Sequence, residues 1–494
     1  MKNKIKSLLA LVMAICMLFA IAGCGDKGKD TSSEQTVSND DFFTDSETEN
    51  TSSTDTQSTA STDKKQSKNT NKGDNGQTGT VTTQTVPKEN QIGGKSWKDV
   101  LASMPKKLRG TKLVMYNWNP ATEYTGAPAV MDAFTKQTGI RVEWRTISHA
   151  VYFTKLPAII ASGENIPDLA RIGYAGISFL KNFQPLSVTK YNFKDEAWDD
   201  SMMKILTVKG KAYGTTLKNT HCSGPNLLFY NKSIIEKEDY EDPYKLWKAG
   251  KWTWKKYLKM ATQAVDDGYF VASTGEQMMP GYAESWNVVG TSFNGTKFTT
   301  NWNTKKFLNV YEELGDLFHG SKGKQKFGYG QEESFNAGQN PFYLGTGVHA
   351  RNKNAYFSNL KANGTLYFVP VPEHEELKGK YYQGFGEIEC YGVPKGASNP
   401  EAVPYFLRYF MDGANYALDT YFGNKQNLEV YNWCMNQTKV VDYGFGPDGV
   451  AGGYGGSEGI HKYTGAQMKT YIDSVMGKVN KYVKELNDEL KNFK

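Results

Sequence analysis

The chain has 494 residues, a formal net charge of +6 and a hydrophobic fraction of 39%. A charge this small does not imply a nucleic-acid partner, and no apolar run beyond the N-terminus is long enough to cross a bilayer. The length suggests two globular parts of ordinary size. Aromatic residues make up 13% of the chain, and tryptophan and tyrosine in such numbers often line sites for flat apolar ligand faces.

The first 23 residues have the layout of a secretory signal peptide. Three lysines stand among the first six residues, and an apolar run follows over residues 8–22. The run ends in Ile-Ala-Gly directly before Cys24, which resembles the bacterial lipobox. The resemblance implies that Cys24 carries a diacyl group and anchors the protein on the outer face of the cell membrane. The alternative is an ordinary cysteine in a cleavable signal.

Residues 24–95 are rich in Ser, Thr, Asp, Asn, Lys and Gly, and they contain no Leu, Met, Trp or Tyr. Such a segment cannot bury enough apolar surface to offset its ordering entropy, so we predict a disordered tether. A flexible coil of this length spans roughly 45 Å root-mean-square. A tether of this length favours a Gram-positive cell surface.

The globular part begins with alternating elements. Short apolar strands are predicted at 112–118, 140–147 and 168–172, and amphipathic helices at 126–138 and 151–161. This order predicts an α/β fold with a parallel sheet and crossover helices. Ligands bind beyond the carboxyl ends of such strands, so the loops after the first and third strands are candidate site segments.

Three passages resemble, in the same order, segments of family 1 extracellular solute-binding proteins. The first has Ala-Ser-Gly, an acidic residue and Pro-Asp after a helix within 156–169. The second has Phe-Tyr-Asn-Lys at 229–232 and Gly-Lys-Trp-Thr-Trp at 250–254. The third has Pro-Val-Pro within 368–372 and Pro-Lys-Gly-Ala-Ser-Asn-Pro-Glu-Ala within 393–402.

The resemblance implies a type II periplasmic-binding-protein fold, in which two lobes close on a ligand like a hinge. It also implies a function in solute capture without catalysis. We expect an oligosaccharide ligand, permease subunits of an ABC importer as partners, and a monomer. A stripe of apolar residues over 468–490 predicts a terminal helix that packs on the core. Lobe 1 is expected at 96–218 plus 391–430, and lobe 2 at 219–390 plus 431–494.

A sugar site needs aromatic platforms and planar polar groups that pair with hydroxyls. His349 stands with Arg351 where related sequences often carry a ligand-facing aromatic, which favours an acidic or heavily hydrogen-bonded ligand. Trp252 and Trp254 begin a helix and are expected to be structural. The candidate ligand contacts are Trp118, Asn119, Tyr174, Asn219, His221, Trp286 and Arg351.

No motif implies a catalytic residue, a metal or a cofactor. Residues 444–449 fit GxGxxG and residues 455–459 fit GxSxG, but neither has the flanking strand and helix that its chemistry needs. Cys222, Cys390 and Cys434 are far apart in sequence and allow at most one disulfide, so buried free thiols are expected.

Two other functions remain open at this point. One is a secreted enzyme that acts on glycans with two carboxylates, although no pair of acidic residues stands out. The other is a sensor or adhesin lipoprotein of the same fold.

Overall fold

A computed structural model describes most of the chain from Trp97 onward. All described residues belong to one compact unit, which falls within Gly76–Lys494. The predicted signal peptide, Cys24 and the tether lie outside them. The described residues are 97–123, 127–173, 177–194, 197–218, 225–269, 271–273, 282–319, 328–329, 332–351, 356–377, 379–385, 389–415, 422–443 and 463–493.

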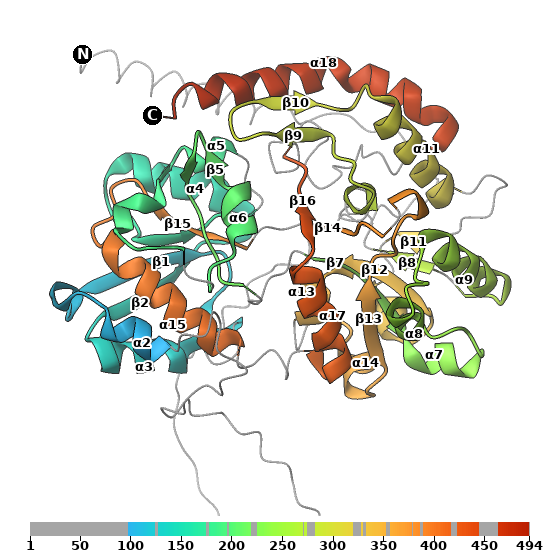
Figure 1. The fold of residues 1–494 in the computed structure, drawn as a ribbon, viewed down its shortest axis with the longest axis horizontal. Coiled ribbons are helices and arrows are strands. Elements are labelled where there is room, and N and C mark those ends of the chain that lie inside the picture. The colour runs from blue at the N-terminus through green and yellow to red at the C-terminus, as the bar shows by residue number, and fades with distance from the viewer. Residues whose placement is uncertain are drawn as a thin grey trace, which may run out of the picture. The chain divides into compact units, whose positions relative to one another are not determined.

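Sheet A contains the three predicted strands, the short strand β4 that follows them, and one strand from late in the chain. Its order is β2-β1-β3-β15-β4, on the left in Figure 1. β1 is parallel to β2 and to β3, so the predicted parallel sheet is confirmed, while β15 is antiparallel to β3. The strands are β1 (Lys112–Asn117), β2 (Arg141–Thr146), β3 (Leu169–Arg171), β4 (Phe183–Gln184) and β15 (Tyr391–Pro394).

Helices cover sheet A as the apolar spacing predicts. Phe134 of α3 is fully buried, and its ring lies 5.4 Å from Phe406 and 5.3 Å from Tyr409 of α15. The elements are α2 (Trp97–Ala102), α3 (Ala127–Thr138), α4 (His149–Ser162), α5 (Ile177–Leu180), α6 (Asp200–Ile205), β5 (Thr207–Val208), β6 (Lys211–Ala212), α15 (Val403–Asn415), and the 3-10 turns Lys106–Leu108, Ala121–Glu123, Leu186–Thr189 and Pro400–Ala402.

Sheet B has the order β11-β8-β12-β7-β13. β12 is parallel to β8, and β7 is antiparallel to both β12 and β13. β8, β11, β12 and β13 therefore share one direction, and β7 alone among the strands of sheet B runs against them. The strands are β7 (Asn226–Asn231), β8 (Val271–Ser273), β11 (Gly328–Tyr329), β12 (Phe342–Thr346) and β13 (Leu366–Pro370).

The helices around sheet B begin at side chains that cap them. Asn231 accepts a hydrogen bond from Ser233 N, Asp242 from Tyr244 N, and Thr253 from Lys256 N. Two of these caps belong to the second family-like passage, so that passage encodes helix starts. The elements are α7 (Lys232–Lys237), α8 (Pro243–Lys248), α9 (Trp254–Asp266), β9 (Thr291–Phe293), β10 (Phe298–Thr300), α11 (Lys305–His319), α12 (Glu332–Asn336), α13 (Gly347–Arg351), α14 (Ser358–Ala362) and the 3-10 turn Glu375–Leu377.

The chain passes between the sheets more than once. It leaves sheet A after Leu217, enters β7 at Asn226, and returns through β14 (Tyr382–Gly384) to β15. The backbones of Thr215 and Tyr391 exchange hydrogen bonds of 2.9 and 3.0 Å, which join the two crossing segments. After α15 the chain forms α17 (Lys425–Met435), which packs on β13, and then β16 (Thr438–Val440), which pairs with β14. The expected lobe boundary at residue 430 falls within α17 and stays a prediction.

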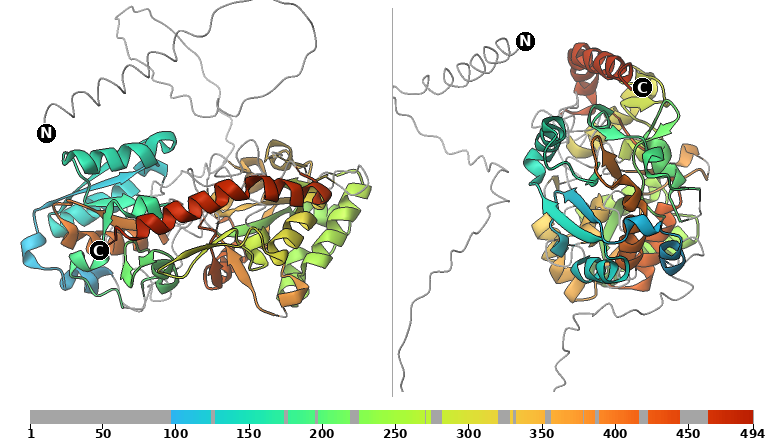
Figure 2. Two further views of the ribbon diagram at one scale, coloured as in Figure 1. Left: turned by 90° about the horizontal axis from the view of Figure 1, so that it is seen from above. Right: turned by 90° about the vertical axis from the view of Figure 1, so that its left-hand side faces the viewer.

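The C-terminal helix α18 (Gly465–Leu490) packs on α11 and β10 beside sheet B, and its far end reaches α5 beside sheet A. Figure 2 shows α18 running past the elements around both sheets. Near this end Glu489 accepts from Lys181 at 3.0 Å, and the Phe493 carbonyl accepts from Lys209 Nζ at 2.8 Å. The predicted apolar stripe is core packing, because Met468, Ile472, Val479, Val483, Leu486 and Leu490 are buried.

Two of the family-like passages meet at Asp168. Its Oδ1 accepts from Ser398 Oγ at 3.0 Å and from Asn399 N at 2.6 Å, and its Oδ2 accepts from Val114 N at 2.9 Å. The side-chain amide of Asn399 donates through Nδ2 to Thr111 Oγ1 at 2.8 Å. This network joins β1, the entry to β3 and the exit from β15, so the Pro-Asp and Ser-Asn-Pro motifs hold sheet A together.

Replacing Asp168 with alanine leaves two backbone amides and one hydroxyl without their acceptor. We expect the free energy of unfolding to fall by about 3 kcal/mol or more, because hydrogen bonds to charged groups contribute about 1.5–3 kcal/mol each. Urea denaturation followed by tryptophan fluorescence measures the loss. Asp473→Ala, which removes an exposed ion pair with Lys469, is the control and should cost under about 1 kcal/mol. Equal losses in the two variants would contradict this role of Asp168.

Candidate functional site

The carboxyl ends of the strands lie where the chain crosses between the sheets. In sheet A, Tyr391 begins β15 opposite Arg171, the last residue of β3. In sheet B, Asn226 begins β7 opposite Thr346, the last residue of β12. Since ligands of open α/β sheets bind at the carboxyl edge, these two edges define the candidate site.

Trp118 follows β1 at the edge of sheet A and is 9% exposed. The Arg171 guanidinium carbon lies 3.8 Å from the centre of its ring, and Tyr152 meets it edge-on at 5.0 Å. Gly173 has φ +62°, and a β-carbon there would lie 2.3 Å from Trp118 Cη2. The indole is therefore held from several sides, and little of its surface is open to a ligand.

Arg171 carries its charge into the interior at this edge. Its Nη2 lies 3.5 Å from Oε2 of Glu389, and both side chains are 1% exposed. Glu389 belongs to the segment that returns from sheet B, and the Tyr391 hydroxyl donates to its Oε1 at 3.4 Å. A buried charge needs such a partner, so the ion pair joins the end of β3 to the returning segment.

Asn119 lies in the turn that follows Trp118. Its backbone amide donates to Asn117 Oδ1 at 3.1 Å, and its carbonyl accepts from Trp144 Nε1 at 3.0 Å. The backbone of Asn119 is thus fixed at the edge, while its side chain is only partly buried.

A second polar group occupies the edge of sheet B. Glu284, 2% exposed, accepts from the backbone amide of Asp442 at 3.1 Å. Asp442 in turn accepts from the backbone amides of Gly290 and Thr291 at 2.6 and 3.0 Å. Burial and the nearby Asp442 carboxylate raise the pKa of Glu284 well above its ordinary value, which favours the protonated, neutral form of this acid.

Trp286 lies inside the core of sheet B. It is 3% exposed, and its ring lies 4.3 Å from His374 and 5.7 Å from Trp254. Trp252 and Trp254 are buried in the same core, which confirms their expected structural role. A ligand contact at Trp286 stays a prediction.

His349 packs among aromatic side chains, and the acidic or heavily hydrogen-bonded ligand that its position favours stays a prediction. His349 is buried in α13, and burial lowers its pKa to about 3, so the ring is neutral. It stacks on Phe357 at 5.7 Å and lies 3.4 Å from the Tyr343 hydroxyl. Arg351 ends α13, and its side chain lies outside the described residues.

Three further candidates, Tyr174, Asn219 and His221, also lie outside the described residues, as do the GxGxxG and GxSxG matches. Within the described ranges no group of three or more His, Cys, Asp or Glu residues could hold a metal ion. Cys390 and Cys434 are buried free thiols, as expected.

Sequence reasoning missed Arg171, Glu389 and Glu284. Arg171 lies within the apolar run Leu-Ala-Arg-Ile, and Glu284 lies within Tyr-Ala-Glu-Ser-Trp. A lone charge in an apolar segment indicates a buried pair or a shifted pKa, and this signal was present in both places.

Glu284→Gln tests the neutral acid. The folded protein holds the Glu284 proton more tightly than the unfolded chain, so its contribution to stability is complete below the ordinary pKa and declines as the pH rises. We therefore expect wild type to lose up to about 1.4 kcal/mol per pH unit relative to Glu284→Gln between about pH 5 and 7. Urea denaturation of both proteins across this pH range measures the difference in their free energies of unfolding.

The control for this experiment is Glu485→Gln on the exposed face of α18, where the side chain is 59% exposed. This variant should follow the wild-type pH profile. A Glu284→Gln profile parallel to wild type would contradict the raised pKa.

The chain is similar to solved structures of two ABC transporter binding proteins and of an extracellular solute-binding protein. The galacto-N-biose-/lacto-N-biose I-binding protein of an ABC transporter from Bifidobacterium longum has a TM-score of 0.56 at 18% identity, over 76% of this chain and 98% of that chain. An ABC transporter-associated binding protein from B. animalis subsp. lactis has a TM-score of 0.54 at 19% identity, over 76% of this chain and 98% of that chain. A Staphylococcus aureus extracellular solute-binding protein has a TM-score of 0.55 at 13% identity, over 76% of this chain and 98% of that chain.

No curated protein matches the chain in sequence. The likeness to the solved structures establishes the fold, which is that of the periplasmic sugar-binding proteins. The sequence itself matches the family described as bacterial extracellular solute-binding protein over residues 129–422. Members of this family are binding components of transport systems and not enzymes. This chain belongs to the family of bacterial extracellular solute-binding proteins.

Proposed function

We propose that this protein captures an oligosaccharide outside the cell and delivers it to the permease of an ABC importer. The observation that carries the proposal is the family match together with two strand edges that face the crossing segments. The family supplies the role in solute capture, and the edges supply the place where a solute would bind.

The carbohydrate assignment rests on the structural relatives and on the chemistry of the edges. The three relatives described above are complexes with lacto-N-biose, β-1,6-galactobiose and maltose. In this chain Trp118 and Asn119 follow β1, and Glu284, whose raised pKa favours its neutral form, lies at the edge of sheet B. Aromatic rings and neutral hydrogen-bonding groups suit a sugar better than an anion.

The binding mechanism we propose is closure of two lobes. Lobe 1 consists of sheet A with its helices, and lobe 2 of sheet B with its helices, α17 and α18 included. A solute bound between the carboxyl edges satisfies polar groups from both lobes only when they are closed. The solute therefore shifts the population toward the closed form, which is the form that docks on the permease. Trp118, Asn119, Tyr174, Asn219, His221, Trp286 and Arg351 remain the proposed contacts.

Anchoring completes the proposal. We infer that Cys24 is lipid-modified after removal of residues 1–23, and that residues 24–95 tether the two lobes to the outer face of a Gram-positive membrane. The lipobox-like sequence and the polar composition of the tether support this.

A thermal-shift screen of the purified protein against neutral oligosaccharides, uronic acids and amino sugars tests the solute class. At 100 times its dissociation constant a true ligand adds about 2.7 kcal/mol to the stability. We expect a shift with one class of neutral glycan and no product formed. A panel without any shift would contradict the sugar assignment, and glycan turnover would contradict the binding role.

The same screen places the ligand when it is repeated on variants. Gly173→Ala removes no polar group, but its β-carbon would displace Trp118, so we expect it to weaken glycan binding at least tenfold, about 1.4 kcal/mol. Trp247→Phe on α8, where the indole packs on Trp433 of α17, is the control and should bind like wild type. Equal glycan affinity of the two variants would contradict a ligand contact at Trp118.

Cys24→Ser tests the anchor. The thioether cannot form without the thiol, so we expect the variant to leave the detergent phase and to lose label from radioactive palmitate. Cys16→Ser, which lies within the predicted signal, should remain lipid-labelled. Palmitate labelling of Cys24→Ser would contradict the assignment.

A further inference from the structure

Lys439 places a positive charge in the interior beside the crossing segments. It lies in β16, opposite Gln383 of β14, on the part of the chain that accompanies sheet B. Its side chain is 4% exposed. A buried ammonium is stable only if acceptors surround it, so its partners show what the residue connects.

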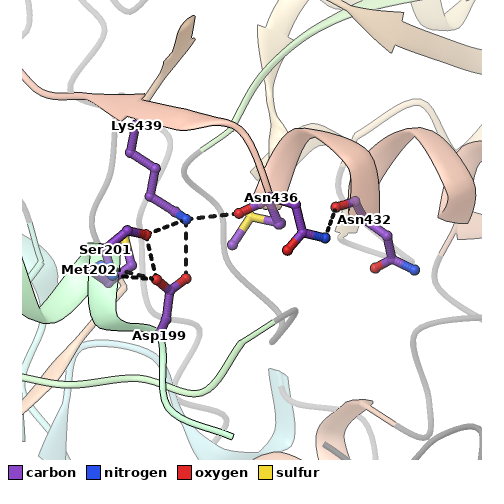
Figure 3. Close-up of polar contacts among 7 residues, drawn as sticks. Asp199, Ser201, Met202, Asn432, Asn436 and Lys439 are labelled. Carbon is purple, nitrogen blue, oxygen red and sulfur yellow. Dashed lines mark hydrogen bonds and ion pairs between the residues drawn. The ribbon is translucent and has the colours of Figure 1, made fainter. Parts of the chain in front are cut away.

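Three acceptors surround the Lys439 ammonium, as Figure 3 shows. Met435 O, at the end of α17, accepts at 2.8 Å, while Ser201 Oγ accepts at 2.7 Å and Asp199 Oδ2 lies at 3.2 Å. Met435 belongs to the sheet B side. Ser201 and Asp199 belong to α6 and its N-cap, on the sheet A side, so the ion pair joins the two sides of the molecule.

Both ends of this ion pair are attached to crossing segments. The Asp199 amide donates to the carbonyl of Thr216 at 3.0 Å, just before the chain leaves sheet A. On the other side, Phe385 follows β14 and its amide donates to Val440 O at 3.2 Å. Phe385 also forms a bridge with Pro225, just before β7. The ion pair therefore lies between the outgoing and the returning segments.

We propose that Lys439 is a positioning residue that restricts the two lobes to a hinge rotation about the crossing segments. The proposal rests on the two-lobe closure proposed above. A rotation about the crossing segments moves groups next to them least, so closure can preserve the three contacts. A twist or a sideways shift of the lobes separates the ammonium from Asp199 and leaves two buried charges unpaired, which is strongly unfavourable. Lys439 thereby restricts the lobes to the motion that brings the two edges together.

Asp199 allows a sharp test because its two oxygens have separate roles. Oδ1 caps α6 by accepting from the amides of Ser201 and Met202 at 3.0 and 3.1 Å, and Oδ2 faces Lys439. Asp199→Asn keeps a capping oxygen and removes the charge. Lys439→Met keeps an unbranched side chain as far as Cε and removes the ammonium. The double variant completes a mutant cycle.

The first measurement is the distance between the lobes in the ligand-free protein. Spin labels are introduced through an unnatural amino acid at Lys136 of α3 and Lys259 of α9, which are both exposed, and pulsed electron resonance gives the distance distribution. We expect Lys439→Met and Asp199→Asn each to broaden this distance distribution. The double variant should have a distribution no broader than that of either single variant. Lys469→Met, which breaks an exposed ion pair within α18, should leave it unchanged.

The second measurement is the affinity for the glycan identified in the thermal-shift screen. If the binding-competent arrangement becomes less populated, the dissociation constant rises in proportion, and we expect about tenfold for each single variant. Lys439→Arg, which retains the charge, should restore most of the affinity and the narrow distribution. Unchanged distributions in folded Lys439→Met and Asp199→Asn would overturn the proposal. Failure of every variant and of wild type to bind glycans would reject the sugar assignment alone, because the distances are measured without ligand.

Discussion

Charged and acidic groups are buried where the chain passes between the two sheets, and each of them requires a partner from another segment. Arg171 meets Glu389, Lys439 meets Asp199, and Glu284 receives the amide of Asp442. Leaving any of these groups unpaired in the interior would be strongly unfavourable. The crossing segments can therefore take few arrangements, and those arrangements determine how the carboxyl edges of sheets A and B are presented to a solute.

This constraint explains why most of the family-like motifs are structural. Asp168 and Asn399 join the strands of sheet A, and Asn231 and Thr253 begin helices. Such residues depend on local backbone geometry, so they keep a recognisable spacing. The solute contacts have no fixed spacing, because they come from loops on different elements that meet only after folding.

The sequence was therefore a good guide to the fold and a partial guide to the site. The strands and helices of sheet A follow from apolar spacing, and the stripe on α18 follows in the same way. Trp118 was placed correctly at a strand end, but its burial beneath Arg171 depends on a charge from β3. His349 and Trp286 were singled out by their position in the sequence, which does not show that tertiary packing buries both. A ligand contact at Trp286 stays a prediction. The pairing of Lys439 with Asp199 spans 240 residues of sequence and could be found only in the folded chain.

The most direct test of this account is hydrogen exchange with and without a neutral oligosaccharide that stabilises the protein. We expect the glycan to slow exchange of backbone amides at both edges, around residues 117–119 and 171–173 of sheet A and around residues 226–228 and 346–349 of sheet B. Protection confined to one sheet, or protection away from the strand ends, would contradict capture of the solute between the two carboxyl edges.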